Sequence, residues 1–386
     1  MQRFYLDQAA TSWPKRPEVL AVVAEFMQET GAAAGRGSYA SARISANWLD
    51  RARIAIAKLI HAPSPDSIAL MTSGTHALNE AIGGTVQPGS HVIASAIEHN
   101  SVLRPLERMR QEGMIELDIV PCDHLGWVNP SDVICLKQSN TQLLAMSHAS
   151  NVTGMIQELQ PLGMWCRENG ITFLVDAAQS IGYVPIDVQS YGIDYLAAPG
   201  HKGLGGILGT GFLYASQAKQ VTHRPLMVGG TGSQSESLFP ELDWPQKVEP
   251  GNLNMPGIVS MAVATEALLR ESFSEREAKM HGDWRRLRDL LSRVPGLQLL
   301  AHADSQKYVG VLSCCHSQFT PTDLAAILDA EFQIEVRAGL HCAAHIHHFL
   351  ETAPMGTLRF SFGHELDPLV AAALEKAVES LSQVDC

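Results

Sequence analysis

The sequence predicts an α/β protein whose large domain carries a mostly parallel sheet and whose smaller C-terminal domain is α+β. Between about residues 54 and 215, short apolar runs alternate with helical patterns, as in sheets whose strands are joined by crossover helices. After about residue 222 this alternation stops, and a different order of strands and helices follows. A chain of 386 residues is long enough for a main domain and a smaller companion.

Six runs in the first region are candidate strands. Each is short, apolar at almost every position, and bounded by Gly, Pro or polar turn residues. A strand that is buried on both faces has this pattern, whereas a half-exposed strand alternates between apolar and polar residues. The candidate strands are residues 67–72, 91–94, 116–120, 143–146, 172–175 and 195–197.

The rest of the chain differs in composition and in its order of predicted helices and strands. The segment 223–257 is rich in Gly, Pro and Ser, so we expect it to be functional or to cross to a partner subunit. A long helix is predicted over residues 259–294, broken near Ser272. We then expect strands at 308–314, 334–337 and 357–362 and helices at 321–331 and 367–384. The division is an N-terminal segment packing on the small domain (1–20), the large domain (21–258), and the connecting helix with the small domain (259–386).

Composition narrows the class of protein. Hydrophobic residues make up 46% and charged residues 18%, which is typical of a globular chain. No run approaches the roughly 20 apolar residues of a membrane span. The net charge of −12 without a Lys/Arg run argues against nucleic acid or an anionic membrane as partner. Seven irregularly spaced cysteines and an N-terminus without a signal-peptide pattern predict reduced thiols in a cytoplasmic protein.

Asp176 is the first candidate for chemistry, because it closes the apolar run 173–175. In open α/β sheets, ligands bind beyond the carboxyl ends of the strands. A buried carboxylate there needs a cationic partner, and a protonated heterocyclic nitrogen would supply one. Taken alone, Asp176 would more often be a helix cap. Gln179 follows one helical turn later.

His201 and Lys202 come at the end of the next apolar run and precede the glycine-rich stretch 203–211. Lysine forms imines with carbonyl cofactors, and glycines lower the steric cost of a bulky adduct. A lone lysine at such a place is a solvated turn residue. An Asp and a His-Lys pair at successive strand ends together indicate a carbonyl cofactor.

Two further motifs follow predicted strands. Thr75 lies in the stretch 72–76 before a helix, where free backbone N–H groups and hydroxyls bind phosphate, although a simple helix cap has the same pattern. His99 could stack on an aromatic cofactor or shuttle protons; without support it is a structural histidine.

Together, these motifs resemble the class V aminotransferase superfamily, and within it the cysteine desulfurases with a short Arg-x-Gly-x-His-Cys-Ala loop. The resemblance runs essentially from end to end, with the motifs in the family's order. They are residues 5–11, 98–101, 147–154, 176–179, 200–202 and 337–343, which read YLDQAAT, EHNS, SHASNVTG, DAAQ, GHK and RAGLHCA. The resemblance implies a fold type I transferase dependent on pyridoxal 5′-phosphate (PLP), with a mostly parallel seven-stranded sheet.

Carried over by position, the resemblance implies a role for each residue that faces the cofactor ring. Lys202 holds PLP as a Schiff base and then moves the Cα proton. Asp176 pairs with the ring nitrogen, Gln179 contacts the ring phenolate oxygen, His99 stacks on the ring, and Asn151 lies beside ring or substrate.

Phosphate and substrate contacts are implied in the same way. Thr75 and His201 reach the phosphate. Arg359 clamps the substrate carboxylate, a task that suits its bidentate fork, and Arg337 is a further substrate contact. Without the resemblance, Arg359 would be a rim arginine on a small-domain strand.

Cys342 separates desulfurases from ordinary transaminases. Gly339, Ala343, Arg337 and His341 around it predict an electropositive, flexible loop, and both features favour a nucleophilic thiolate. The alternative is a buried cysteine in a tight turn. The nearby histidines 345, 347 and 348 do not have paired zinc-ligand spacing, so no metal is expected.

Three positions depart from the family pattern around the phosphate. His76 stands where relatives usually carry Glu, and Pro199 replaces a Ser or Thr. Asn252 takes the place of a Thr that in relatives reaches across the dimer to the phosphate; its amide can still donate. His76 and Asn252 are therefore candidate cofactor contacts as well.

The predicted function is a homodimeric, PLP-dependent cysteine desulfurase that turns L-cysteine into L-alanine and leaves a persulfide on Cys342 for a possible acceptor protein. The nearest alternative is a selenocysteine lyase. An aminotransferase or C–S lyase in which Cys342 is incidental, and a non-enzymatic sulfur carrier or sensor, are further alternatives.

Overall fold

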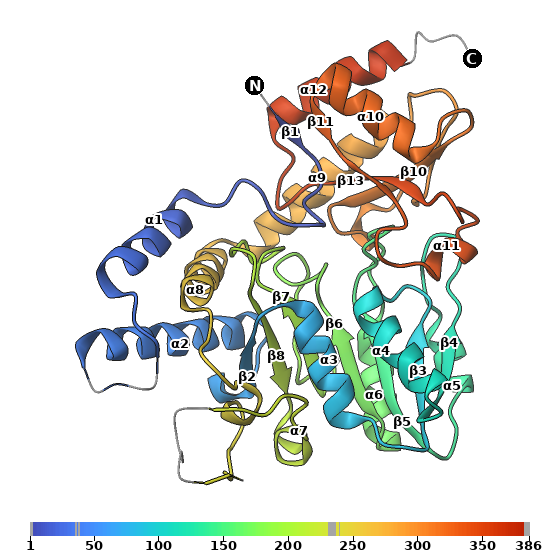
Figure 1. Ribbon diagram of the computed structural model, residues 1–386. Coiled ribbons are helices and arrows are strands. Elements are labelled where there is room, and N and C mark those ends of the chain that lie inside the picture. Colours follow the sequence, from blue (N-terminus) through green and yellow to red (C-terminus); the bar gives the residue numbers. More distant parts are fainter. Residues whose placement is uncertain (1–2, 35–36, 38, 231–236, 239, 382–386) are drawn as a thin grey trace.

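The computed structural model describes residues 3–34, 37, 39–230, 237–238 and 240–381. Figure 1 shows the large domain with its sheet and, above it, the small domain, beside which both ends of the chain lie. Among the described helices, none has the length and apolar character needed to cross a membrane.

A seven-stranded sheet forms the centre of the large domain. Its strand order is β2-β8-β7-β6-β5-β3-β4, and β8 runs antiparallel to both of its neighbours while the other pairs are parallel. The mostly parallel sheet is thereby confirmed. The strands are β2 (Ile68–Met71), β3 (Ser90–Ser95), β4 (Ile115–Val120), β5 (Thr141–Ser147), β6 (Thr172–Asp176), β7 (Tyr195–Pro199) and β8 (Gly211–Ala215).

Both faces of this sheet are buried, which explains the uninterrupted apolar runs. On β6, Phe173 and Val175 belong to one hydrophobic cluster and Leu174 to the other. Strand β8 was not among the candidate strands, because the glycines before it have the composition of a loop. Its residues are nevertheless all buried.

Helices cover the two faces of the sheet (Figure 1). Ser73 caps α3 by accepting from the His76 N–H at 3.0 Å. Helices α1 and α2 both pack on α8. The helices of this domain are α1 (Pro17–Glu25), α2 (Ala40–Leu59), α3 (Gly74–Thr85), α4 (Asn100–Gln111), α5 (Pro130–Cys135), α6 (Leu159–Asn169), α7 (Gln217–Thr222) and α8 (Met255–Arg270), with short helical turns at Phe26–Thr30, Pro65–Ser67 and Gln246–Val248.

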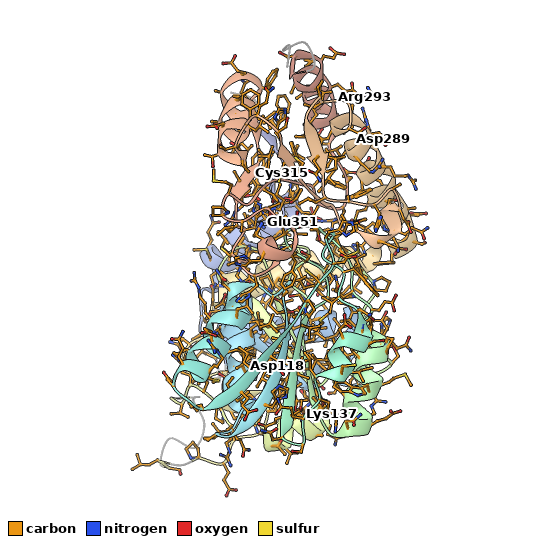
Figure 2. All side chains as sticks on the ribbon, turned by 90° about the vertical axis from the view of Figure 1, so that its right-hand side faces the viewer. Asp118, Lys137, Asp289, Arg293, Cys315 and Glu351 are labelled. Carbon is orange, nitrogen blue, oxygen red and sulfur yellow. The ribbon has the colours of Figure 1, made fainter. Side chains whose placement is uncertain are left out.

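The small domain contains an antiparallel sheet of order β12-β13-β10-β9. Figure 2 shows the two domains from the side, with Asp118 on β4 of the large sheet and Cys315 on β10 above it. The strands are β9 (Leu297–Leu299), β10 (Val311–His316), β12 (Arg337–Gly339) and β13 (Thr357–Ser361). The helices are α9 (Phe273–Leu291), α10 (Pro321–Phe332), α11 (Ile346–Phe349) and α12 (Pro368–Leu381), with a helical turn at Ser305–Lys307.

Two predictions for this half of the chain need refinement. The long connecting helix is two helices, α8 and α9, and Ser272 caps the second at the predicted break. The predicted strand 334–337 is split into β11 (Ile334–Glu335) and β12, and β11 pairs with β1 (Phe4–Tyr5) at the N-terminus. Part of segment 223–257 and the end of the last predicted helix lie outside the described residues. The domain boundaries themselves stay a prediction.

Candidate active site

A cavity of about 230 Å³ lies where the carboxyl ends of β6 and β7 meet the small domain. It brings together residues that come from the whole length of the chain. The predicted site residues that line it are Thr75, His99, Asn151, Asp176, Gln179, His201, Lys202, Arg337, Cys342 and Arg359.

Asp176 ends β6 and is only 6% exposed. Its Oδ1 accepts a hydrogen bond from the Ala178 N–H at 2.8 Å, and burial raises the pKa of the carboxyl above its usual value. Gln179, one turn later, donates from Nε2 to the Ala9 carbonyl at 3.0 Å. A buried carboxylate at a strand end, facing a cavity, is suited to a cationic ligand atom.

Lys202 lies in the loop that follows β7. Burial lowers the pKa of its amine to about 8, and the charge of Asp176 acts in the opposite direction. The loop must contain glycine at its next position, because a Cβ on Gly203 would lie 2.0 Å from the Ile181 carbonyl oxygen. The lysine therefore follows directly on a tightly packed turn, and about half of its amine is neutral near pH 8.

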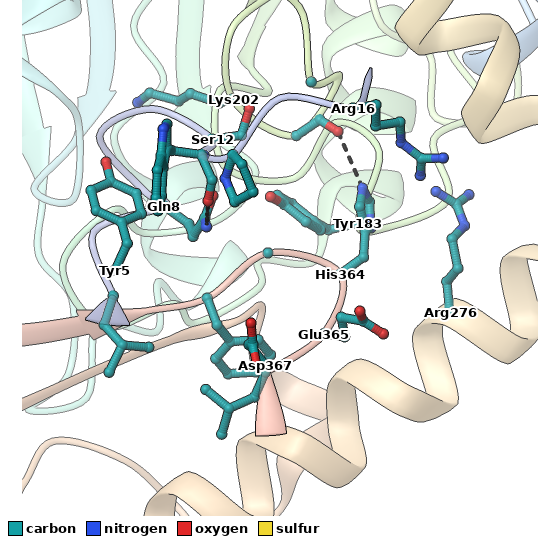
Figure 3. A pocket seen from close by; sticks show the side chains of 18 of the residues that line it. Tyr5, Gln8, Ser12, Arg16, Tyr183, Lys202, Arg276, His364, Glu365 and Asp367 are labelled. Atoms are coloured by element: carbon teal, nitrogen blue, oxygen red, sulfur yellow. Dashed lines mark hydrogen bonds between the residues drawn. The ribbon is translucent and has the colours of Figure 1, made fainter. Parts of the chain in front are cut away.

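The N-terminal segment supports Lys202 from behind. The carbonyl oxygen of His201 accepts hydrogen bonds from the Ser12 N–H at 2.9 Å, the Ser12 hydroxyl at 3.0 Å, Lys15 Nζ at 3.0 Å and the Thr11 hydroxyl at 3.2 Å. A second cavity of about 600 Å³ lies beside this segment and shares Lys202 with the first (Figure 3). The backbone before Lys202 is thus fixed by the N-terminal segment.

His99 caps α4 with its ring. Its Nδ1 accepts from the Ser101 N–H at 3.0 Å, so the other ring nitrogen carries the proton of the neutral imidazole. Burial, followed by the charge of Lys202, lowers the pKa of His99 to about 4. The Ser101 hydroxyl also meets the Thr75 hydroxyl at 2.7 Å. A neutral, oriented ring therefore faces the cavity next to two hydroxyls.

The start of α3 forms the predicted phosphate end of the cavity. Gly74 and Thr75 line it, and the first-turn N–H groups of a helix attract anions. The side chain of His76 does not line the cavity; its Nδ1 lies 3.2 Å from the Thr72 hydroxyl because the first turn directs it away. Asn252 is exposed and also lies outside the cavity lining. The expected contact of Asn252 with the phosphate in a partner subunit stays a prediction.

Arg359 on β13 is 1% exposed. Its Nη2 donates to Asp7 Oδ1 at 2.5 Å, and its Nη1 donates to the Asn151 carbonyl at 2.9 Å. Its Nε is buried and has no hydrogen-bond partner among the described residues. The amide of Asn151 donates in turn to the His341 carbonyl at 2.6 Å. The guanidinium is thus oriented by two oxygens and keeps an unused donor.

Cys342 lies on the loop after β12 and is exposed. His341 and Cys342 both have positive φ angles, +49° and +59°, which are uncommon for residues other than glycine. The Cys342 carbonyl accepts from the Asn100 N–H at 2.7 Å, and Arg337 Nη2 lies 3.8 Å from the sulfur. The thiol is accessible and next to a cation, as predicted.

Several residues of the site had no role assigned from the sequence. Glu98 is fully buried and accepts from the Ser147 N–H at 2.7 Å, and burial raises the pKa of its carboxyl to about 8. Ser147, Ser101 and His341 line the cavity, and Asp7 pairs with Arg359. Asp7 and Glu98 belong to the motifs 5–11 and 98–101. Their place in these motifs is the sequence signal that could have indicated a role in the site.

Comparison with known proteins comes to the same family. The family described as aminotransferase class-V matches residues 4–367. A probable cysteine desulfurase of Methanothermobacter thermautotrophicus is 35% identical over 344 residues, 88% of this chain and 84% of the relative. One of Pyrococcus abyssi is 30% identical and covers 98% of this chain and 94% of the relative.

Solved structures are similar over nearly the whole chain. The apo structure of cysteine desulfurase from Thermococcus onnurineus NA1 has a TM-score of 0.91 at 27% identity and covers 99% of this chain and 94% of its own. The cysteine desulfurase CsdA from Escherichia coli, in its S-sulfonic acid form, has a TM-score of 0.89 at 27% identity, with coverages of 100% and 96%.

Proposed function

The chain belongs to the class V aminotransferase family, and from this premise we propose that it is a PLP-dependent cysteine desulfurase that converts L-cysteine to L-alanine. One observation carries the proposal. A single cavity is lined by Lys202, Asp176 and Arg359 and by the accessible thiol of Cys342. A transaminase needs the first three groups; the thiol is what a desulfurase needs in addition.

The residues of the cavity fit PLP. Lys202 offers an amine whose pKa of about 8 leaves a usable neutral fraction, and Asp176 offers a buried carboxylate without a cationic hydrogen-bond partner among the described residues. The neutral ring of His99 and the start of α3 suit an aromatic ring and a phosphate. When bound, PLP supplies a carbonyl that forms imines with amines and a ring that withdraws electrons.

The chain's own groups then have separable tasks. Asp176 would hold the ring nitrogen of the cofactor by accepting its hydrogen bond, and its charge would keep that nitrogen protonated. Arg359 would hold the substrate carboxylate with the N–H groups of its terminal nitrogens that have no partner. Lys202, once its amine is free and neutral, would take the proton from the substrate Cα and hold it on Nζ for a later return. Asn151 and Gln179 keep the ring and Arg359 in place.

Sulfur transfer is the task of Cys342. Its thiolate attacks the substrate sulfur, so that an S–S bond forms and the C–S bond breaks. The electron pair of the broken bond stays on the substrate carbon, which takes a proton and becomes the methyl group of alanine. Cysteine and the enzyme thiol therefore give alanine and an enzyme persulfide, without an external oxidant or reductant. Arg337 Nη2 lies 3.8 Å from this sulfur and can donate a hydrogen bond to it.

The test is to incubate the PLP-loaded protein with cysteine and a reductant, and to measure alanine and sulfide together. Equal amounts of both products support the proposal. A keto acid in place of alanine would indicate a transaminase or C–S lyase. Turnover of selenocysteine that survives Cys342→Ala, with no turnover of cysteine, would indicate a selenocysteine lyase.

We also propose that the protein acts as a homodimer. The predicted contact of Asn252 with the cofactor phosphate of a partner subunit requires one. Segment 223–257 exposes several apolar side chains, among them Leu226 at 57%, Val228 at 81% and Leu238 at 93%. Apolar groups clustered in one segment are typical of a protein–protein interface. Analytical ultracentrifugation measures the mass directly, and a monomer at micromolar concentration would contradict this part. A cytoplasmic location and an acceptor protein for the sulfur stay predictions.

A further inference from the structure

Arg359 is a buried cation whose counter-ion comes from the other end of the chain. Its side chain is 2% exposed, and its Nη2 lies 2.5 Å from Asp7 Oδ1. A guanidinium does not lose its proton in proteins, so burying it without a negative partner is costly. The ion pair with Asp7 therefore offsets the cost of burying Arg359 in the ligand-free protein.

Asp7 is fixed in its place by the backbone on both sides. The Leu6 carbonyl accepts from the Ser361 N–H at 2.7 Å, and the Gln8 N–H donates to the Ser361 carbonyl at 3.2 Å. These two bonds tie the N-terminal segment to β13, two residues from Arg359. Because both partners are attached to the same strand, the carboxylate of Asp7 remains close to the guanidinium.

Arg359 lines the cavity, and its two terminal nitrogens each carry one N–H group beyond the one that is used. Nη1 and Nη2 each have one partner, and Nε is buried with none among the described residues. Buried donors without partners are rare, and a ligand carboxylate is the acceptor that matches this fork. A bound carboxylate would then share one guanidinium with Asp7, and two carboxylates this close repel each other.

We propose that Asp7 is the resident counter-ion of Arg359 and limits the affinity of the site for the carboxylate of an amino acid. The inference rests on the proposed function, in which Arg359 receives that carboxylate. Asp7 stabilises the empty site and competes, through the shared guanidinium, with every bound amino acid. Substrate and product carry the same carboxylate, so this competition also helps the product to leave. Asp7 is thus a positioning residue that acts through Arg359.

The test compares L-alanine with L-alaninamide, which lacks the carboxylate, in calorimetric titrations of the PLP-loaded protein. Asp7→Asn removes the charge and keeps the size and one acceptor oxygen. It is expected to bind alanine on the order of tenfold more tightly, because one of two close negative charges is gone, and alaninamide as the wild type does.

Glu335→Gln is the matched control. Glu335 pairs with Arg3 at 2.6 Å, not with Arg359, and belongs to β11, which pairs with β1 in the same N-terminal segment. This variant also loses one carboxylate of an ion pair, so it reports on any general loosening of the strand. Its affinities for alanine and alaninamide are expected to equal those of the wild type.

Thermal unfolding gives a second readout. Without a ligand, Asp7→Asn is expected to melt below the wild type, because Arg359 loses its counter-ion, and alanine should raise its midpoint more than it raises that of the wild type. Should Asp7→Asn not fold, Asp7→Ser removes the same charge and serves in both measurements.

Alanine affinity that is unchanged or weaker in the charge-removing variant would overturn the proposal, as would an equal gain for alaninamide. Equal binding of alanine and alaninamide by the wild type would overturn it too, because Arg359 would then not hold a carboxylate. The expected gain in alanine affinity without any sulfide formation from cysteine would leave this inference standing and remove only the proposed reaction.

Discussion

The two ends of the cavity are built in different ways. Lys202 lies in a turn directly behind a buried strand of the large sheet, and the carbonyl before it accepts four hydrogen bonds from the N-terminal segment. Cys342 lies on an exposed loop of the small domain with two consecutive left-handed residues. The end of the cavity at Lys202 is held by many contacts, whereas the end at Cys342 is accessible and has a strained backbone.

This difference has a chemical reason. A cofactor must keep one position relative to its proton donors and acceptors, so the sheet and the N-terminal segment hold Lys202 rigidly. A thiol that receives sulfur and passes it on must reach two partners, which suits an exposed loop. We therefore expect changes at the Lys202 end to remove all chemistry, and changes at the Cys342 end to remove only sulfur transfer.

The largest effect is expected for Lys202→Ala. Without its amine, both imine formation and proton transfer at the substrate Cα are lost, so alanine formation should fall by at least about 10³-fold. The measurement is alanine released from cysteine, together with the absorption of the bound cofactor. Lys219→Ala is a control in the same domain, because Lys219 donates to the Thr172 hydroxyl away from the cavity. Appreciable activity of Lys202→Ala would contradict the proposed role of the Lys202 amine.

Cys342→Ala should abolish the release of sulfur from cysteine, by about 10²-fold or more, and leave amino-acid binding intact. The reason is that this side chain handles only the sulfur in the proposed reaction. Sulfide formation measures the release of sulfur, and the spectral change on adding alanine measures amino-acid binding. Cys135→Ala, which removes another exposed thiol, is the control. Loss of alanine binding in Cys342→Ala would mean that the two ends are not separable.

Uptake of PLP by the cofactor-free protein should depend on the pKa of Lys202. The neutral amine forms the imine, and burial lowers the pKa to about 8, so the uptake rate should rise with pH and level off above about 8. At pH 7 it should be about one tenth of the plateau, because a tenth of the amine is then neutral. Stopped-flow absorbance measures this rate. A rate still rising steeply at pH 10 would show an ordinary, solvated lysine.

The smallest effect concerns Arg337, which lies 3.8 Å from the Cys342 sulfur. Arg337→Gln should slow alkylation of Cys342 by iodoacetamide about threefold, since a nearby cation favours the thiolate. Mass spectrometry of the labelled peptide follows the rate, and Cys135 in the same sample is the internal control. An unchanged rate would mean that loop exposure alone accounts for the reactivity of the thiol.

The sequence was most informative where burial on both faces leaves a clear pattern. The strands that lead to Asp176 and Lys202 are uninterrupted apolar runs; Asp176 closes its run, and Lys202 lies in the turn that follows its own. Strand β8 was missed because its first residue and the stretch before it are rich in glycine. Those glycines serve close packing, as at Gly203 against the Ile181 carbonyl, so local composition there reflects tertiary contacts.

Residue types and their order along the chain were thus enough to predict the α/β fold, the family and ten of the residues that meet at the cavity. Only the tertiary structure showed the side chain of His76 turned away from the cavity, and Asp7 placed against Arg359 across 352 positions of sequence. A strand pattern depends on neighbours two residues apart, so a linear sequence preserves it. An ion pair between Asp7, just after β1, and Arg359 on β13 depends on how two distant segments pair, and no local pattern records that.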